Sequence, residues 1–397
     1  MSIFATEYNG DVTASFFSFK HSYIKQSVWA IASGFMFFSI LGFDRRILQL
    51  ISYPMYGFVL FLLVMVLLIG QTTKGQQNWI NLGAFKLQPS EFAKFGTAMA
   101  LAKYFDTPNM RFVTWREHLT AYAILGLPLL LVAGQGDAGS CLVFAAFIFV
   151  LNREGLSDLV IYLGLYVIVI SVLSLIINPI YIIGISIVLF CILIYWNWLN
   201  KQLVKILAVI MIGTCLYTYS VSYIFNNVLE KHQRDRINVV LGKELTKEAR
   251  HGIAYNLNQS KIAIGSGGII GKGYLQGTQT RYNYVPETST DFIFSAIGEE
   301  WGFLGSLVLI AVYISMLIRM LLLAERQRSP YGRVYIYSVV AIIFTHVVIN
   351  IGMTIGLLPV IGIPLPLLSY GGSSLLSFTF MIATALKLDS ERRMTMR

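Results

Sequence analysis

Residues 159–177 read LVIYLGLYVIVISVLSLII, an unbroken stretch without a single charged side chain. A helix needs about 20 predominantly apolar residues to cross the hydrocarbon core of a bilayer. The stretch is therefore predicted to be a membrane-spanning helix, and comparable runs recur along the whole chain. We predict such helices over 27–43, 50–70, 91–105, 119–134, 138–151, 159–177, 180–197, 203–228, 292–323, 334–357 and 367–387.

The composition supports the same fold class. The chain has 397 residues, of which 56% are hydrophobic and 13% charged, and its mean hydropathy is +0.67. Such a chain is too apolar for a soluble globule, and its apolar runs lack the alternation that a membrane barrel needs. We predict an all-α, polytopic transmembrane bundle of about 10 to 11 helices, forming a single domain over 1–397 with one long extracytoplasmic loop near 229–290.

The basic residues predict how the bundle is oriented. The net charge is +10, but lysine and arginine are spread over short loops rather than gathered in a stripe, which argues against nucleic-acid binding. Basic loops normally face the cytoplasm. We place there residues 45–46, 111–116, 153, 201–205, 326–333 and 392–397. The polar segments 71–90, 135–137, 229–290 and 357–366 then lie outside.

The cysteines and histidines predict no structural metal and no disulfide. The three cysteines are odd in number and all lie in apolar runs. The five histidines lack the spacing of zinc ligands.

The stretch VPETSTDFIF, residues 285–294, places Asp291 where a polar loop meets a long apolar helix. A carboxylate at the edge of a membrane is costly to desolvate, so it usually marks a function. Aspartate is also a preferred residue at a helix N-cap. The residues alone leave open whether Asp291 is a cap, part of a pathway or a reaction centre.

Glu91 and Lys94 lie three residues apart, so they share one helix face and can pair inside the membrane. Either they only orient helices, or they form the wall of a polar cavity. Similarly, Glu299 and Glu300 could line that cavity or orient Asp291. Asp137 could cap the span that follows it.

Other polar motifs allow two interpretations each. Residues 369–374 combine hydroxyls and glycines at a helix entrance, which suits helix capping or an anionic group. The glycines within 265–273 fit neither nucleotide-binding fingerprint, and we interpret them as turns that let the backbone approach the membrane surface or a ligand. His346 and Asn350 share a helix face and are predicted to form interhelical hydrogen bonds. Cations in the hydrophilic segment are solvated loop charges or phosphate ligands: Arg234, Arg236, Lys261, Lys272 and Arg281.

Several of these segments together resemble the SEDS family of peptidoglycan glycosyltransferases. The matching blocks are Gln88–Lys94, Asn258–Gly268, Pro286–Gly302, Asn350–Met353 and Pro364–Ser374. The resemblance implies an enzyme that polymerises lipid II outside the bacterial cytoplasmic membrane, forming β-1,4 bonds and releasing undecaprenyl diphosphate. It also implies a class B penicillin-binding protein and other elongation-complex membrane proteins as partners.

Inverting transfer from a diphosphate donor needs a base for the acceptor hydroxyl, and cations or hydrogen-bond donors for the leaving group. The resemblance assigns the base to Asp291. A divalent cation, Mg²⁺ or Mn²⁺, at the diphosphate is left open. The residues expected to bind substrate or line its cavity are Gln88, Ser90, Glu91, Lys94, Asp137, Gln259, Lys261, Glu287, Thr290, Glu299, Glu300, Ser369 and Ser373.

The chain also departs from the family pattern. Ser289 stands where the family usually has histidine, Gly136 where it has proline, and Asn78 where it has arginine, so substrate contacts are affected more than the reaction. Family members have ten helices with both ends inside, and the first span here aligns with their second. We interpret residues 1–10 as the end of a first helix that is otherwise missing. Three spans in 159–228 replace one, which predicts an extra helical hairpin.

Two functions of other classes compete with this interpretation. A flippase for the same lipid usually carries inverted repeats, which the sequence does not show, and a scaffold would have no need of charges in the membrane. Within the family, residues 350–353 and 262–267 favour an elongation enzyme over a septal one.

Overall fold

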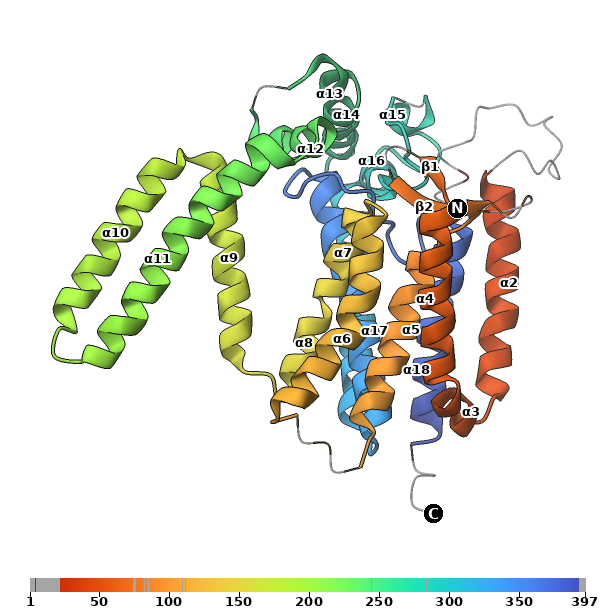
Figure 1. Cartoon of the computed structure of the whole chain (residues 1–397). Coiled ribbons are helices and arrows are strands. Elements are labelled where there is room, and N and C mark those ends of the chain that lie inside the picture. Colours follow the sequence, from red (N-terminus) through yellow and green to blue (C-terminus); the bar gives the residue numbers. More distant parts are fainter. Residues whose placement is uncertain are drawn as a thin grey trace. The chain divides into compact units, whose positions relative to one another are not determined.

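The computed structural model describes residues 4, 22–73, 76–81, 83, 86–108, 110, 112–243, 245–282 and 284–392. The chain divides into two compact units (Figure 1). Unit 1 comprises the chain up to Leu156 and from Ala254 onward, and unit 2 is Ser157–Ile253. The predicted end of a first helix, residues 1–10, lies almost entirely outside the described residues.

Unit 1 holds most of the helices. They are α2 (Ser22–Gly42), α3 (Arg45–Leu50), α4 (Ser52–Ile69), α5 (Pro89–Phe105), α6 (Trp115–Gly134), α7 (Ala138–Ala145), α8 (Phe147–Arg153), α14 (Ile253–Ser266), α15 (Thr278–Arg281), α16 (Ile293–Glu325), α17 (Pro330–Thr354) and α18 (Gly372–Ser390). Most run up and down in one layered bundle, with α14 and α15 at its upper end in Figure 1.

Unit 2 begins with three long apolar helices, α9 (Asp158–Ile176), α10 (Pro179–Trp196) and α11 (Lys201–Tyr223). The last continues into a π-helical turn, η1 (Ile224–Val228), which is followed by α12 (Lys231–Leu241) and α13 (Lys247–His251). Hydrogen bonds join α9 to α11, from Tyr166 to Thr214 and from Ser171 to Tyr217. These helices occupy the region of the predicted extra hairpin.

The predicted fold class is confirmed. A helix lies in each of the eleven predicted spans, and eight helices among the described residues are long and apolar enough to cross a membrane. The others are α5, the α7–α8 pair and α18, which are shorter or more polar. The hydrophilic segment 229–290, predicted as a loop, is largely helical because it contains α12, α13, α14 and α15.

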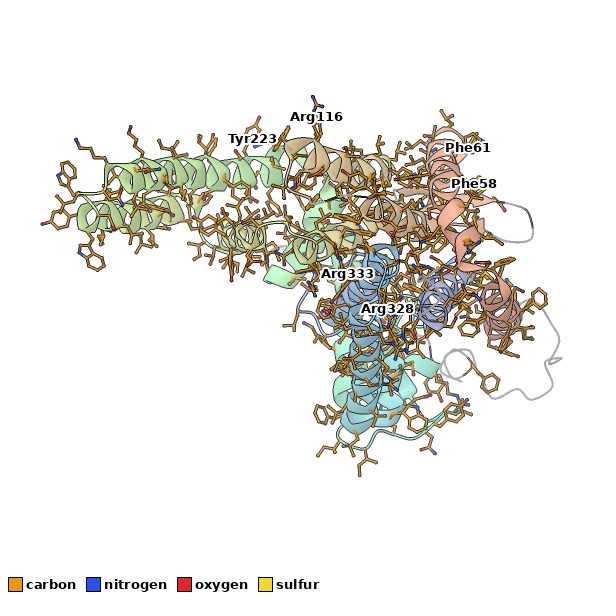
Figure 2. All side chains as sticks on the ribbon, turned by 90° about the horizontal axis from the view of Figure 1, so that it is seen from below. Phe58, Phe61, Arg116, Tyr223, Arg328 and Arg333 are labelled. Carbon is orange, nitrogen blue, oxygen red and sulfur yellow. The ribbon has the colours of Figure 1, made fainter. Side chains whose placement is uncertain are left out.

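Helices α5 and α17 form the centre of unit 1. Helix α5 packs against α4, α6, α17 and α18, and α17 also packs against α16 and α8. In the most apolar window of α17, 72% of the residues are buried, against 6–22% in the other spanning helices. At the periphery, Phe58 and Phe61 of α4 are exposed, as a lipid-facing surface requires (Figure 2). Polar residues on α5 and α17 are therefore shielded from water and lipid by the surrounding helices.

Arg116, Arg328 and Arg333, three of the basic residues predicted to face the cytoplasm, lie at the lower end of the bundle (Figure 2). Arg333 bonds Glu154 at 2.7 Å, Arg153 bonds Glu325 at 3.0 Å, and Arg326 pairs with Asp389. These bonds tie together the ends of α8, α16, α17 and α18. Of the predicted basic residues, Arg111, Arg393 and Arg397 lie outside the described part of the chain.

A small antiparallel sheet at the upper end was not predicted. Its strands β1 (Gln71–Thr73), β2 (Gln76–Asn81) and β3 (Lys86–Leu87) lie in that order, with Gln71 opposite Trp79 and Ile80 opposite Leu87. Such short strands carry too few residues for an alternating pattern to stand out. The sheet leads the chain directly into α5.

Candidate active site

The turn that carries Asp291 is held through its backbone. Three successive carbonyls, those of Ser289, Thr290 and Asp291, each accept a hydrogen bond from a different donor. The donors are the Tyr370 amide at 2.8 Å, the Ser369 hydroxyl at 2.6 Å and the Asn350 side-chain amide at 2.9 Å. The loop before α18 and the buried helix α17 thus fix the path of this turn.

The turn is also closed from inside. The carbonyl of Glu287 accepts hydrogen bonds from the backbone amides of Thr290, at 3.1 Å, and Phe292, at 3.3 Å. Glu287 itself has a φ of 59°, in the left-handed region that non-glycine residues seldom adopt. Glu287 and Thr290, both predicted site residues, therefore shape the turn beside Asp291.

Helix capping does not explain Asp291. Helix α16 begins at Ile293, and its N-cap is Phe292, which makes no side-chain capping bond. Asp291 precedes the cap and is half-buried, at the upper end of the bundle. Its Oδ2 lies 3.2 Å from where a Cβ on Gly362 would be, so the 360–364 segment runs past the carboxylate.

The loop between α17 and α18 is anchored by two residues of α17. Asn350 Nδ2 donates to the Ile363 carbonyl at 2.7 Å as well as to that of Asp291. One helical turn away, His346 Nδ1 lies 3.1 Å from the Pro364 carbonyl. Because that carbonyl can only accept, Nδ1 carries the proton and Nε2 is an acceptor. The predicted hydrogen-bonding role of these residues is confirmed, but their partners are loop carbonyls and a lysine.

That lysine is Lys94, which pairs with Glu91 as predicted. Its Nζ lies 2.7 Å from Glu91 Oε1 and 2.9 Å from His346 Nε2, and it faces the Phe378 ring at 5.7 Å from the ring centre. The side chains of Lys94 and Glu91 are 0% and 3% exposed. The pair is therefore enclosed by protein and connects α5 to α17 and its loop.

Asp137 organises a second polar cluster. Its Oδ1 accepts from the Ser140 amide at 3.0 Å, so it caps α7 as the sequence suggested. Its Oδ2 accepts from Ser140, Ser90 and Gln88 side chains, at 2.8, 3.3 and 3.3 Å. Asn78, which stands where the family has arginine, reaches the same oxygen at 3.4 Å. Gly139 of α7 lies against Ile361 and Ile363, which places this cluster beside the loop.

The hydroxyls of Ser369 and Ser373, on either side of the start of α18, do not cap that helix. Its N-cap is Gly371, with no side-chain capping bond. Ser369 instead accepts from the Leu365 amide at 2.8 Å and donates to Thr290. Ser373 accepts from the Gln88 amide and donates to the Lys86 carbonyl, both at 3.3 Å. These serines join segments that are distant in sequence, which capping alone would not do.

Glu299, predicted to line the cavity or to orient Asp291, contacts a different segment. Its carboxylate is fully buried and accepts from the amides of Gln279 and Thr280, both at 2.9 Å, and from Lys272 Nζ at 2.6 Å. Glu299 thereby holds the 272–280 segment against α16. Lys272, for which the sequence left open a solvated loop charge or a phosphate ligand, has its ammonium bound to the same carboxylate.

Glu300 serves the same segment. Its Oε1 accepts from the Leu275 amide at 3.2 Å, and its backbone carbonyl accepts from the Gly273 amide at 2.9 Å. Burial raises the pKa of the nearby Tyr274 phenol, and the negative charge of Glu300 adds to this rise, so the phenol stays protonated. These contacts of Glu300 go to the 273–275 segment and do not orient Asp291.

Two of the glycines within 265–273, Gly267 and Gly271, lie against the backbone of α16. A Cβ on Gly267 would lie 2.0 Å from the Gly298 carbonyl oxygen, and one on Gly271 would lie 2.2 Å from that of Glu300. Helix α16 accommodates this approach with a kink at Gly302, where φ is 65° and ψ is −160°. Gly267 and Gly271 therefore allow the backbone of this segment to contact the backbone of α16.

Lys261 remains a candidate phosphate ligand. It is exposed on α14, and its ammonium lies against Gly356, whose φ is +83° and whose Cβ, if present, would lie 2.6 Å from the Nζ atom. Helix α14 is attached there by Ser260, which donates to the Thr354 carbonyl at 3.0 Å. Gln259 is half-buried on the same helix. Arg234 and Arg236 lie in α12 of unit 2, where Arg234 donates to the Asn226 carbonyl.

Sequence reasoning missed three residues that hold the site. Tyr370 donates through its backbone, Tyr313 donates its hydroxyl to the Pro366 carbonyl at 2.5 Å, and Gln26 accepts from the Gly371 amide at 3.3 Å. Backbone donors leave no pattern in a sequence. Tyr313 was detectable only as a polar group inside an apolar span, and Gln26 lies just before the first predicted span.

Among the described residues, no three histidine, cysteine, aspartate or glutamate side chains come together as metal ligands. The site is instead a half-buried carboxylate on a turn held through its backbone, with a buried ion pair linked through His346 to the adjacent loop and an exposed ammonium, that of Lys261, near the end of α17. A held carboxylate of this kind can accept a proton from a hydroxyl at the membrane surface.

A multi-pass helical bundle with an acidic turn at one end defines a class of polytopic membrane enzyme, and comparison with known proteins gives the family. The FtsW/RodA/SpoVE family model, described as cell cycle protein, matches residues 8–181 and 151–394. The chain belongs to this family.

Individual relatives agree with the family match. The chain is 33% identical over 345 residues to the peptidoglycan glycosyltransferase MrdB of Escherichia coli K12, covering 86% of this chain and 78% of that protein. It is 30% identical to the peptidoglycan glycosyltransferase RodA of Treponema pallidum, covering 97% and 93%. A solved peptidoglycan synthase complex contains a chain with 26% identity and a TM-score of 0.65, covering 94% of this chain and 90% of that one.

Proposed function

We propose that this protein is a peptidoglycan glycosyltransferase that polymerises lipid II, with Asp291 as the general base. The Asp291 carboxylate takes the proton of the acceptor's 4-hydroxyl, whose oxygen forms the β-1,4 bond to C1 of the donor sugar. The bond between C1 and the diphosphate breaks, and undecaprenyl diphosphate leaves with the electron pair. The steps assigned to this chain use protein groups alone.

The observation that carries this proposal is the way Asp291 is held. Three consecutive carbonyls of its turn are hydrogen-bonded to rigid parts of the bundle, while its side chain is only half-buried. A base must sit within hydrogen-bond reach of the proton that it removes, and fixing its position lowers the entropic cost of reaction. A residue with only a structural role would not need an accessible carboxylate.

Lys261 is the best placed residue to stabilise the leaving diphosphate. It is exposed and lies at the C-terminal end of α17, within about two helical turns of Asn350 and hence of the Asp291 segment. A cation near the developing charge lowers the barrier to departure. Gln88, Ser90 and Asp137 form a hydrogen-bonded cluster beside the loop, in which Ser90 and Asp137 are buried and Gln88 is half-buried, so Gln88 is the member best placed to contact a sugar hydroxyl.

We place the Asp291 end outside the cytoplasmic membrane, because the arginines at the other end follow the positive-inside rule. A class B penicillin-binding protein is the proposed partner, which fits the similarity to a chain from a complex that coordinates polymerisation and crosslinking. The similarity to MrdB and RodA favours a role in elongation and cell shape over septation.

The test uses purified full-length protein in liposomes with labelled lipid II, alone and with the partner. Wild type should make glycan polymer, and Asp291→Asn should reduce the rate by about 10²- to 10⁴-fold. Asp44→Asn is the matched control, because Asp44 caps α3 at the other end and asparagine caps equally well. Equal polymerisation by wild type and Asp291→Asn would remove Asp291 from the mechanism.

The same preparation separates the competing functions. A flippase would move labelled lipid II between leaflets without making polymer. A scaffold would do neither, and its Asp291→Asn variant would still recruit the partner. Either result would overturn the proposed enzyme activity.

A further inference from the structure

We propose that Asn350 is a positioning residue for Asp291, acting through the Asp291 and Ile363 carbonyls; this rests on the proposed function of Asp291. Asn350 lies on α17, which is the most buried of the eight spanning helices, and is itself 0% exposed. Its amide nitrogen uses one N–H for the Asp291 carbonyl at 2.9 Å and the other for the Ile363 carbonyl at 2.7 Å.

The orientation of the amide follows from its partners. Both neighbours are carbonyl oxygens, which only accept hydrogen bonds, so the nitrogen must face them. The Oδ1 atom is buried and makes no hydrogen bond with any residue that the structure describes. An unsatisfied buried acceptor is costly. Asn350 therefore leaves Oδ1 unsatisfied while Nδ2 joins the Asp291 turn to the loop at Ile363. This indicates that the residue serves the contact between these two segments, which we call the junction, and not the helix itself.

The junction joins the two chain segments that meet beside the carboxylate. One is the turn of Asp291, and the other is the loop that passes the carboxylate at Gly362. Asn350 is bonded to Asp291 itself and to Ile363, the neighbour of Gly362. Without it, the Asp291 carbonyl loses the bond nearest to the reacting group, whereas the Ser289 and Thr290 carbonyls keep theirs.

His346 gives the junction a second attachment. It donates to the Pro364 carbonyl, and Lys94 donates to its other ring nitrogen. The loop is therefore held at adjacent residues, Ile363 and Pro364, by side chains four positions apart on α17. Of these two side chains of α17, Asn350 is the one that also bonds Asp291, so its loss should affect the position of the carboxylate more than loss of His346.

The experiment compares Asn350→Leu and Asn350→Asp with Thr354→Val in the full-length protein. Leucine fills a similar volume without donors, and an ionised aspartate would place acceptors against two carbonyls. Thr354 lies on the same face of α17, is fully buried and donates only to its own helix, at the Ile351 carbonyl. Thr354→Val therefore removes a buried polar group from α17 without touching the junction.

Two measurements distinguish positioning from folding. Displacement of a reacting group by about 1 Å can reduce turnover by about 100-fold. We expect Asn350→Leu to lower kcat by about that factor with little change in KM, and to shift the acid limb of the pH profile, since the surroundings of Asp291 change. Asn350→Asp should be at least as impaired, and Thr354→Val should stay within about twofold of wild type.

The second measurement does not depend on activity. Hydrogen exchange should be faster in peptides covering 285–292 and 360–366 of Asn350→Leu, and unchanged in the middle of α17. Wild-type exchange in both peptides would overturn the positioning role, whatever the enzyme makes. The positioning role would also be overturned if kcat fell only in proportion to the amount of folded protein and the pH profile did not shift. If Asp291→Asn polymerises lipid II normally while hydrogen exchange is faster in Asn350→Leu, Asp291 is not the base, but Asn350 still holds the two segments together.

Discussion

Two lysine–glutamate pairs in unit 1 have nearly the same length and very different surroundings. Lys94 and Glu91 are 2.7 Å apart with side chains 0% and 3% exposed, and Lys272 and Glu299 are 2.6 Å apart with side chains 25% and 0% exposed. Glu299 also accepts hydrogen bonds from two backbone amides, whereas Glu91 Oε2 is buried without a partner among the described residues.

The difference shows how two ion pairs made of the same residue types come to have different roles. Glu299 has its hydrogen-bonding capacity filled by the segment that it holds, so it is a structural anchor. Glu91 is not satisfied in this way, and its lysine continues through His346 to the loop beside Asp291. Polar groups that remain partly unsatisfied in a core indicate function more strongly than saturated ones.

The largest expected effect follows from removing one charge of the fully buried pair. Lys94→Met keeps much of the side-chain volume but leaves Glu91 without a counter-charge in the bundle. Breaking a buried ion pair in this way costs about 3–5 kcal/mol. We expect the free energy of unfolding in detergent, measured by denaturant titration, to fall by that amount, and polymerisation to be lost.

The double variant Glu91→Gln with Lys94→Met sharpens this prediction. It removes both charges, so most of the lost stability should return, since replacing a whole buried pair is often neutral. Activity should remain low if the pair also supports the loop. A double variant no more stable than Lys94→Met would show that the pair is not electrostatically coupled.

The half-buried pair should respond less. Glu299→Gln still offers one acceptor, and Lys272 is exposed enough to be solvated, so the cost is about 1–3 kcal/mol. The consequence should be local: the 272–281 segment should detach from α16, and trypsin should cleave after Lys272 faster than in wild type. Lys243→Gln, in unit 2, is the control that should leave this cleavage rate unchanged. An unaltered rate in Glu299→Gln would contradict the anchoring role.

Much of this arrangement could be predicted from the sequence, for a physical reason. Spanning helices are set by the length of apolar runs, and the Glu91–Lys94 pair by helical periodicity, so both are local properties. Asp291 could be identified as unusual because a carboxylate at the edge of an apolar helix is costly.

The partners of these residues could not be predicted. Glu299 and Asp291 differ in role because of backbone amides at 279 and 280 and carbonyls at 289–291, and backbone groups are the same in every residue. The approach of Gly267 and Gly271 to α16 likewise depends on a kink at Gly302 that the sequence does not reveal. Long-range pairing of this kind is a property of the fold.

The smallest effect is expected for an exposed pair at the basic end of the bundle. Arg153 and Glu325 are 3.0 Å apart, with side chains 50% and 51% exposed. Pairs of this kind contribute about 0.2–1 kcal/mol and weaken with salt. Arg153→Gln should therefore lower the free energy of unfolding by less than about 1 kcal/mol, and by less still in high salt.

Arg333→Gln is the matched comparison, because its partner Glu154 has a side chain only 7% exposed. Loss of Arg333 leaves that carboxylate with less access to water, so the variant should be destabilised more than Arg153→Gln and should be less sensitive to salt. Equal effects of the two substitutions would mean that burial of the carboxylate does not set the strength of a pair here. The ranking of Lys94, Lys272 and Arg153 would then need another cause, such as the number of hydrogen bonds that each carboxylate accepts.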